Sequence, residues 1–278
     1  MQQNPVIVGV MGWPVSHSLS PVIHTHWIQK HSLNGSYRLF PVHPDNLEAA
    51  IRGLSALQLS GSNVTIPHKV AAMKYMDWIH PDALKIGAIN TIVVNPDGAL
   101  HGFNTDGFGF LENLRSNAPN WDKSRGPATV IGAGGAARSI LIALLEKGIQ
   151  EIRLTNRTTE KAQELASEFG PQIQVVKWQD RHDALSGASL LVNTTNQGMK
   201  GQPALDLRLD KLPSSAVVSD IVYNPLHTTL LKEAHNRGNL CVDGLGMLIH
   251  QARPAFNAWF GVLPEASEDL RRKLLGLI

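Results

Sequence analysis

The chain has 278 residues, of which 43% are hydrophobic and 17% are charged, a composition typical of soluble globular proteins of about two domains. A formal net charge of +2, without any block of like charges, gives no indication of a nucleic-acid or membrane-surface partner. The single cysteine, Cys241, can form no internal disulfide, and no apolar run approaches the roughly 20 residues that span a bilayer. Residues 1–14 lack the basic segment of a signal peptide. We therefore expect a cytoplasmic protein without nucleic-acid or membrane partners.

The first hundred residues alternate short apolar runs with helix-forming segments, which predicts an α/β layer structure. Ser20 is expected to cap the first helix, Pro21 fits the first helical position, and Asp45 is expected to cap the second helix. Residues 95–98 predict a turn between two paired strands. The expected strands are 6–11, 37–42, 61–67, 89–94 and 99–103, and the expected helices are 22–33, 46–57 and 69–79.

A second alternating series begins at residue 128, after a helix over 106–114 and polar connecting stretches at 117–120 and 123–127. Its expected strands are 128–131, 151–155, 188–192, 216–222 and 240–242, and its expected helices are 136–147 and 159–169. Two tail helices, 245–260 and 267–275, are expected to return to the first domain. The sequence thus predicts an α/β protein with two α/β domains flanking a cleft, the second a Rossmann-like doubly wound parallel sheet. The expected domains are 1–105 plus 244–278, and 106–243.

A glycine-rich turn, Gly132-Ala-Gly-Gly-Ala-Ala137, follows the strand 128–131 and opens the next helix, the setting in which this pattern indicates dinucleotide binding. The first glycine permits a tight turn, and the second lets the backbone approach a pyrophosphate. A small third residue lets helix and strand pack closely. The free amides at the helix N-terminus favour phosphate. We therefore predict a nucleotide site at this turn.

The choice of nicotinamide cofactor is predicted from the end of the next strand, where an NAD-selective site carries Asp or Glu. Here the segment reads Asn156-Arg-Thr158, with Lys161 one helical turn later, and no carboxylate stands at the tip. An arginine can stack on adenine and form a forked hydrogen bond with a 2′-phosphate. The segment therefore favours NADP as the cofactor.

Two polar strings precede the glycine turn: Asn63-Val-Thr-Ile-Pro-His-Lys69, and Gly87-Ala-Ile-Asn-Thr91 followed by Asn104-Thr-Asp106. They place a lysine and a carboxylate in loops ahead of a dinucleotide fold. A hydride-transfer enzyme needs such groups, because a ketone that receives a hydride must also gain a proton. Ser18 and Ser20 lie beside an expected helix N-terminus, where a substrate carboxylate is favourable.

Together with Ser16-His-Ser-Leu-Ser-Pro21 and Asp243-Gly-Leu-Gly-Met247, these strings resemble shikimate dehydrogenases nearly from end to end. The resemblance implies reversible NADPH-dependent reduction of 3-dehydroshikimate to shikimate in aromatic amino-acid biosynthesis. Lys69 would transfer the proton, and Asp106 would hold Lys69 and a substrate hydroxyl in register. The implied substrate contacts are Ser18, Ser20, Asn63, Thr65, Lys69, Asn90, Asp106, Tyr223 and Gln251. The implied cofactor contacts are Gly132, Ala133, Gly134, Gly135, Ala136, Asn156, Arg157, Thr158, Lys161, Thr194, Ile221, Gly244 and Met247.

Other interpretations share parts of this pattern. A quinate/shikimate dehydrogenase with broader substrate and cofactor use is the nearest, although Arg157 argues against an NAD site. A non-catalytic shikimate-pathway ligand sensor could lose the lysine or the glycine turn, and both are present here. A folate-linked dehydrogenase shares the architecture but lacks the serine-rich string at 16–21. Oligomeric state stays open between monomer and homodimer.

No metal site is predicted among the twelve histidines. His24 and His26 point about 200° apart on a helix, so they cannot share an ion. No Cys or carboxylate spacing completes a zinc set.

Overall fold

The computed structural model describes residues 4–123 and 126–278, so residues 124–125 of the expected connection and residues 1–3 lie outside it. The chain divides into two compact units. Unit 1 comprises Met1–Asp106 and Ile249–Leu277, and unit 2 comprises Gly107–Leu248 with Ile278. Among the described residues, no helix has both the length and the apolar character needed to cross a bilayer.

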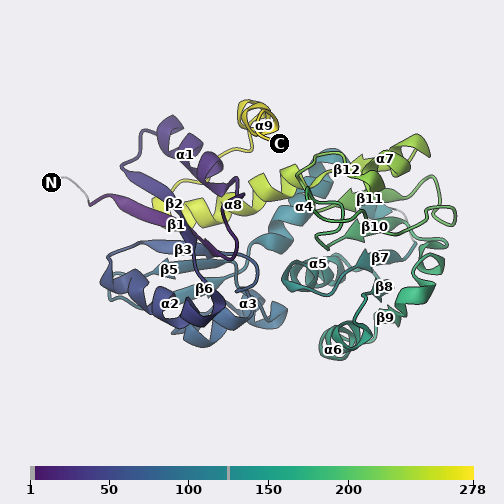
Figure 1. Cartoon of the computed structure of the whole chain (residues 1–278), viewed down its shortest axis with the longest axis horizontal. Helices are drawn as coiled ribbons and strands as arrows, with labels where there is room; N and C mark the ends of the chain where they lie inside the picture. The colour runs from purple at the N-terminus through teal and green to yellow at the C-terminus, as the bar shows by residue number, and fades with distance from the viewer. Residues whose placement is uncertain (1–3, 124–125) are drawn as a thin grey trace. The chain divides into compact units, whose positions relative to one another are not determined.

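Unit 1 is built on a six-stranded mixed sheet with the order β2-β1-β3-β5-β6-β4 (Figure 1). Strand β1 pairs in parallel with β2 and β3, whereas β5 is antiparallel to both β3 and β6. The strands are β1 (Val6–Gly12), β2 (Gly35–Pro41), β3 (Gly61–Val64), β4 (Trp78–Ile79), β5 (Thr91–Val94) and β6 (Leu100–Phe103). The helices are α1 (Ser20–Lys30), α2 (Leu47–Ala56), α3 (Pro81–Ile86) and α9 (Glu268–Leu275), with most of α8 (Gly244–Phe260) and the 3-10 turns η1 (Pro44–Asn46) and η2 (Ala71–Tyr75).

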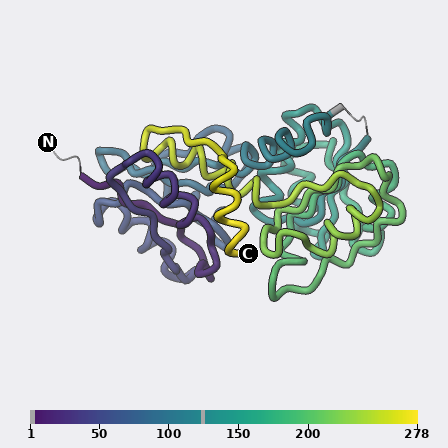
Figure 2. The backbone as a smooth tube through the Cα atoms, turned by 90° about the horizontal axis from the view of Figure 1, so that it is seen from above, coloured from purple at the N-terminus to yellow at the C-terminus, as the bar shows by residue number. Residues whose placement is uncertain are grey.

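Helices cover both faces of the unit 1 sheet (Figure 1). On one face, α2 buries Ile51 and Leu54 against Val64 and Ile92 of the sheet. On the other face, Trp27 of α1 packs edge-on against the ring of Phe256 in α8, with ring centroids 5.4 Å apart. The tail therefore lies against the start of the chain in unit 1, and Figure 2 shows its yellow trace beside the purple one.

Unit 2 is built on an all-parallel sheet with the order β12-β11-β10-β7-β8-β9. The central strands β7 (Ala128–Ile131), β10 (Leu190–Asn193) and β11 (Val217–Asp220) are buried at every position, as expected for a parallel sheet with both faces covered. The outer strands are β8 (Ile152–Thr155), β9 (Ile173–Val176) and β12 (Leu240–Val242). The remaining elements are α4 (Asp106–Asn117), α5 (Gly135–Glu146), α6 (Thr159–Phe169), α7 (Thr229–Asn236) and the 3-10 turns η3 (Trp121–Lys123), η4 (Trp178–Asp180) and η5 (Asp183–Leu185).

The two faces of this sheet carry separate cores. Helices α4, α5 and α6 pack on one face, with Leu114, Ile140 and Leu165 against Val130. Helix α7 and the segments before β11 pack on the other face. Strand order reverses between β7 and β10, which is the switch point where open parallel sheets bind ligands. The predicted α/β class with a Rossmann-like parallel sheet is confirmed.

One expected helix, 69–79, is wrong. Only the short 3-10 turn η2 forms there, and the chain then extends into β4. The cause is pairing with β6: the Asp77 amide donates to the Leu100 carbonyl at 2.9 Å, and the Leu100 amide donates to Asp77 Oδ2 at 2.7 Å. These tertiary bonds outweigh the local helical pattern. Helix α3 and the edge strand β9 were not predicted.

Both expected helix caps are also wrong. Leu19 occupies the N-cap of α1 without a side-chain bond, and Ser20 is the first helical residue, although Pro21 does stand in the first turn as expected. Asp45 lies inside η1, where its amide donates to Nδ1 of His43 at 3.4 Å. The buried Ser20 side chain is instead hydrogen-bonded to Tyr37 of β2.

Candidate functional site

The lysine and the aspartate predicted from the polar strings meet in unit 1. Lys69, in the loop after β3, forms an ion pair through Nζ with Oδ2 of Asp106, the first residue of α4. The two side chains are only 14% and 5% exposed. The Lys69 ammonium is thus nearly buried and held by a carboxylate, an arrangement compatible with a positioned proton donor.

Asn90, in the loop before β5, joins this pair to the tail of the chain. Its amide group donates to Oδ1 of Asp106 at 2.9 Å and to Oε1 of Gln251 in α8 at 3.3 Å. The Thr105 hydroxyl donates to the backbone carbonyl of Gln251 at 2.7 Å. The tail thus brings Gln251 beside Asn90 and Asp106, although 161 positions separate Asn90 from Gln251.

Asn63 at the end of β3 extends the same network. Its Nδ2 donates to the carbonyl of Asn90 at 3.1 Å, which fixes the amide orientation because that carbonyl can only accept. Its Oδ1 accepts the hydroxyl of Tyr37 at 2.7 Å. Burial raises the pKa of Tyr37, so the phenol stays protonated and keeps donating to Asn63.

The two serines and Thr65 occupy the surrounding loops. Ser18 is half-buried, and its Oγ accepts the amide of Ser20 at 3.3 Å. The buried Ser20 side chain is hydrogen-bonded to Tyr37, which links it to Asn63. Thr65 is half-buried, and its amide donates to the carbonyl of Met11 at 2.9 Å. Its side chain does not join the network among the described residues.

Tyr37 was missed by the sequence analysis, as was Thr105. Tyr37 is an ordinary inward-facing residue of β2, and its ring stacks on His24 with centroids 4.0 Å apart and planes 9° apart. His24 is fully buried, which lowers its pKa to about 3, and neither ring nitrogen has a hydrogen-bond partner in the described part of the chain. His24 therefore acts as a neutral packing ring. Only the spatial proximity of Tyr37 to Asn63 reveals its place in the site.

The glycine turn in unit 2 has the geometry that a dinucleotide requires. Gly132 follows β7 with φ +109°, and a Cβ there would lie 2.6 Å from Oγ1 of Thr194. Gly134 is the N-cap of α5, and among the described residues no side chain caps the helix and a Cβ added to Gly134 would meet no atom of a non-neighbouring residue within 4 Å. Ala137, in the first turn of α5, is fully buried. The uncapped amides and the open space above Gly134 fit a pyrophosphate.

The predicted adenine-side residues follow β8. Arg157, Thr158 and Lys161 are exposed, and Asn156 Nδ2 donates to the carbonyl of Thr158 at 2.8 Å, which closes the turn into α6. Within residues 4–123 and 126–278, Arg157 and Lys161 take part in no ion pair. Both cations are therefore available to a ligand phosphate.

The remaining predicted residues of unit 2 lie in three segments. Thr194 is buried after β10, and its hydroxyl donates to the carbonyl of Ile131 at 2.7 Å. Ile221 and Tyr223 follow β11 and are half-buried, and burial raises the pKa of Tyr223. Gly244 opens α8 so close to Ile221 that a Cβ would lie 2.3 Å from its carbonyl oxygen. Met247 is buried one turn later.

Family models match both units. Residues 10–92 match the shikimate dehydrogenase substrate binding domain, and residues 115–200 match shikimate/quinate 5-dehydrogenase. A shikimate dehydrogenase (NADP(+)) of Paramagnetospirillum magneticum is 52% identical over 97% of this chain and 98% of its own length. The chain belongs to the shikimate dehydrogenase family.

Solved structures agree with this family assignment. Shikimate 5-dehydrogenase from Thermus thermophilus, in complex with NADP(H) and shikimate, is 37% identical with a TM-score of 0.86, over 96% of this chain and 99% of that one. Quinate dehydrogenase from Corynebacterium glutamicum, in complex with NAD, is 28% identical with a TM-score of 0.90, over 98% and 99%. The family resemblance predicted from the sequence is confirmed.

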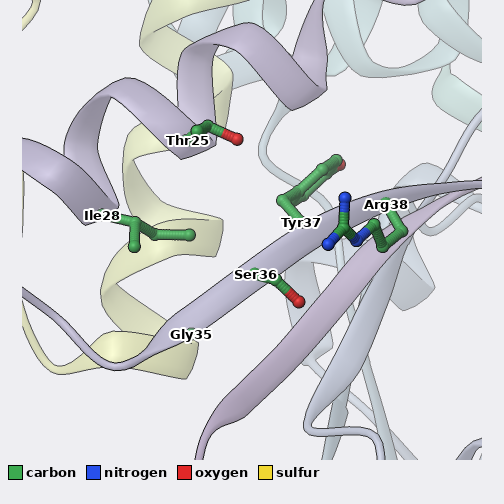
Figure 3. Close-up of a pocket in the computed structure, with 6 residues that line it drawn as sticks. All are labelled: Thr25, Ile28, Gly35, Ser36, Tyr37 and Arg38. Atoms are coloured by element: carbon green, nitrogen blue, oxygen red, sulfur yellow. The ribbon is translucent and has the colours of Figure 1, made fainter.

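The structure also contains a pocket that the predicted residues do not line. A pocket of about 190 Å³ between α1 and β2 is lined by Thr25, Ile28, Gly35, Ser36, Tyr37 and Arg38, as Figure 3 shows. None of the predicted site residues lines it. Among the described residues, no group of three His, Cys, Asp or Glu side chains could hold a metal ion.

Proposed function

We propose that this chain catalyses the reversible NADPH-dependent reduction of 3-dehydroshikimate to shikimate, a step of aromatic amino-acid biosynthesis, with Lys69 and Asp106 as its catalytic pair. The curated relatives confirm the reaction and the cofactor predicted from the sequence. The observation that supports the catalytic roles is the buried ion pair between Lys69 and Asp106, with Asn90 and Gln251 attached to the same carboxylate network.

Lys69 is proposed to transfer the proton. In the reductive direction the substrate ketone accepts a hydride on carbon, and negative charge builds on its oxygen. The Nζ ammonium of Lys69 stabilises that charge and donates a proton to the oxygen, which gives the alcohol. In the oxidative direction the neutral amine accepts the alcohol proton. Asp106 holds Nζ in place, and its own position is fixed by Asn90.

Unit 1 is proposed to be the substrate-binding domain. Ser18 and Ser20 would receive the substrate carboxylate, with Asn63, Thr65, Asn90 and Gln251 as hydrogen-bonding partners for the ring oxygens. These residues offer hydroxyl and amide donors and acceptors, which suits a small ring that carries one carboxylate and several oxygens. Tyr223 of unit 2 is proposed as a further substrate contact.

Unit 2 is proposed to be the NADP-binding domain. Bound NADPH supplies the hydride. The turn from Gly132 to Ala136 and the N-terminus of α5 would hold the pyrophosphate, because the amides there are uncapped. Asn156, Arg157, Thr158 and Lys161 would bind the adenosine 2′-phosphate, and Thr194, Ile221, Gly244 and Met247 would surround the nicotinamide side.

One assay distinguishes this function from its alternatives. Formation of NADPH or NADH is measured by near-ultraviolet absorbance, with shikimate or quinate as the substrate and NADP or NAD as the oxidant. We expect the highest kcat/KM for shikimate with NADP. A preference for quinate with NAD, the pair named for the Corynebacterium relative, would favour the quinate enzyme. Ligand binding without turnover would favour a sensor.

We also propose that the protein is cytoplasmic, is a monomer or homodimer, and has no nucleic-acid partner. Support comes from the single cysteine and the net charge of +2, which require neither an oxidising compartment nor a polyanion. Light scattering of the purified protein measures the oligomeric state.

A further inference from the structure

Asp220 ends strand β11 of unit 2 and is fully buried. Three hydrogen-bond donors converge on its carboxylate. Asn193 Nδ2 donates to Oδ1 at 2.9 Å, and the amide of Val222 donates to the same oxygen at 3.0 Å. The hydroxyl of Thr228 donates to Oδ2 at 2.7 Å. No sequence motif singles out this residue.

These donors come from the loops that leave two neighbouring strands. Asn193 ends β10, and its Oδ1 accepts both the amide and the hydroxyl of Thr195, at 3.0 and 2.8 Å. Its Nδ2 also reaches the carbonyl of Gln197 at 3.2 Å. Asn193 therefore shapes the loop that contains Thr194, and Asp220 holds Asn193.

Asp220 holds the second loop at both of its ends. The bond to Val222 fixes the chain directly after β11, and the bond to Thr228 fixes it where α7 begins. The Thr228 oxygen also accepts the amide of Leu231 at 3.3 Å, so it caps α7. Tyr223 lies in the segment between Val222 and Thr228, and Ile221 lies between Asp220 and Val222.

The surroundings of this carboxylate are neutral. In the described part of the chain no charged side chain acts on Asp220, and burial outweighs the three hydrogen bonds, so the pKa of Asp220 rises to about 6. A carboxylate without a counter-ion is an unusual choice for a site that needs only packing. Its value lies in accepting three bonds at once in fixed directions.

We propose that Asp220 is a positioning residue for dinucleotide binding, because it ties the Thr194 loop and the Ile221–Tyr223 loop into one rigid edge beside the Gly132 turn. That edge lies directly against the turn, since a Cβ at Gly132 would lie 2.6 Å from Oγ1 of Thr194 and 2.8 Å from Cγ2 of Thr195. Asp220 itself is fully buried and acts through the two loops. The inference rests on the proposed NADP-dependent activity.

The test compares variants that break or keep these bonds in the full-length protein. Asp220→Ala removes all three acceptors, and we expect Kd for NADPH, measured by its fluorescence, to rise roughly 10- to 100-fold. Asp220→Asn should restore binding to within about threefold of wild type. Its amide oxygen can still accept from Asn193 and Val222, and its amide group can donate to Thr228.

A second pair of variants applies if Asp220→Ala does not fold. Thr228→Val has nearly the same shape and removes the bond to Oδ2 together with the cap on the Leu231 amide, but it keeps the other two donors on Asp220, so we expect a smaller rise in Kd, about three- to tenfold. Thr228→Ser keeps the hydroxyl and should bind NADPH like wild type. A separate readout is kcat at saturating NADP, which should change less than Kd.

The outcomes separate this inference from the proposed function. Wild type that neither binds NADPH nor oxidises shikimate contradicts the proposed function. Active wild type together with normal NADPH binding by Asp220→Ala, or by Thr228→Val, overturns the positioning role. Loss in Asp220→Asn equal to that in Asp220→Ala also overturns it, because the negative charge would then matter and the hydrogen-bond geometry would not.

Discussion

The buried aspartates of the two units differ in whether a cation compensates their negative charge. In unit 1 the buried Asp106 has a cationic partner in Lys69, so the pair is neutral as a whole. In unit 2 the buried Asp220 has only neutral donors, and the cations Arg157 and Lys161 stand exposed without an ion pair among the described residues. The first arrangement suits proton transfer, because a proton can leave Lys69 while Asp106 stays in place. The second fixes loop geometry and leaves positive charge for a ligand.

Removal of the unit 1 cation should have the largest effect. Lys69→Ala deletes the proposed proton donor and leaves Asp106 buried without its cationic partner, so we expect kcat to fall roughly 10²- to 10⁴-fold. Steady-state kinetics with shikimate and NADP measure the loss, and Kd for shikimate should change far less. The exposed Lys74→Ala is a matched control and should be as active as wild type. Near-normal turnover in Lys69→Ala would exclude Lys69 from the mechanism.

Asp220, the buried carboxylate without a cationic partner, should make the free energy of unfolding depend on pH. Its pKa rises from 3.8 to about 6 on folding, so between these values the native state binds more protons than the unfolded state. The free energy of unfolding should therefore decrease as pH rises from about 4 to about 6. Ionisation of Asp220 should lower the free energy of unfolding by about 3 kcal/mol over this range, and the lower value should persist above pH 6.

Chemical denaturation of wild type and Asp220→Asn across this pH range isolates that contribution, because the other groups cancel in the difference. We expect the variant to be the more stable of the two at pH 7, with the difference shrinking toward pH 4. A difference that does not vary with pH would show that folding leaves the pKa of Asp220 unshifted, and the expected cost of its burial would then be wrong.

Arg157, an exposed cation of unit 2, should strengthen binding only of a cofactor that carries a 2′-phosphate. Arg157→Ala should raise KM for NADP roughly 10- to 100-fold, the loss expected for a charged hydrogen bond, and should spare KM for NAD. NAD thus serves as the control within the same variant. Equal losses for both cofactors would mean that Arg157 acts through folding.

The smallest effect is expected inside the neutral part of the unit 1 network. Tyr37→Phe keeps the stack on His24 and removes the hydroxyl that bonds Asn63 and Ser20, so KM for shikimate should rise about three- to tenfold. KM for NADP should stay unchanged. Tyr75→Phe removes a phenol hydroxyl elsewhere in unit 1 and is the matched control. An unchanged KM for shikimate in Tyr37→Phe would place the Tyr37 hydroxyl outside the substrate site.

Much of the fold could be predicted because its local signals agree with the tertiary structure. The apolar strand before Gly132 and the periodic helix after it form as predicted, and the helix over 159–169 has the predicted bounds. The prediction failed where long-range pairing decides. The backbone at Asp77 is extended because Asp77 forms two hydrogen bonds with Leu100 of β6. The sequence of residues 69–79 contains no signal for that distant partner.

The candidate site divides in the same way. Lys69, Asp106 and Asn90 belong to characteristic strings, so the sequence could name them before their contacts were seen. Tyr37 and Asp220 sit on strands in positions that any buried residue could fill. Their importance comes from what they touch, Asn63 for the one and Asn193 with Thr228 for the other, and a linear pattern does not contain such contacts.

The open space at Gly134 has a consequence for mutational scanning. At Gly132 the protein itself excludes a side chain, through the positive φ and the nearby Thr194, so folding and activity selections should both reject substitutions there. Gly134 has φ −93° and no neighbour within reach of a Cβ, so the free protein can accept alanine there. Only a bound pyrophosphate would collide with it. Positions that a folding screen tolerates and an activity screen rejects would therefore identify the residues that contact the cofactor, with Gly134 as the first.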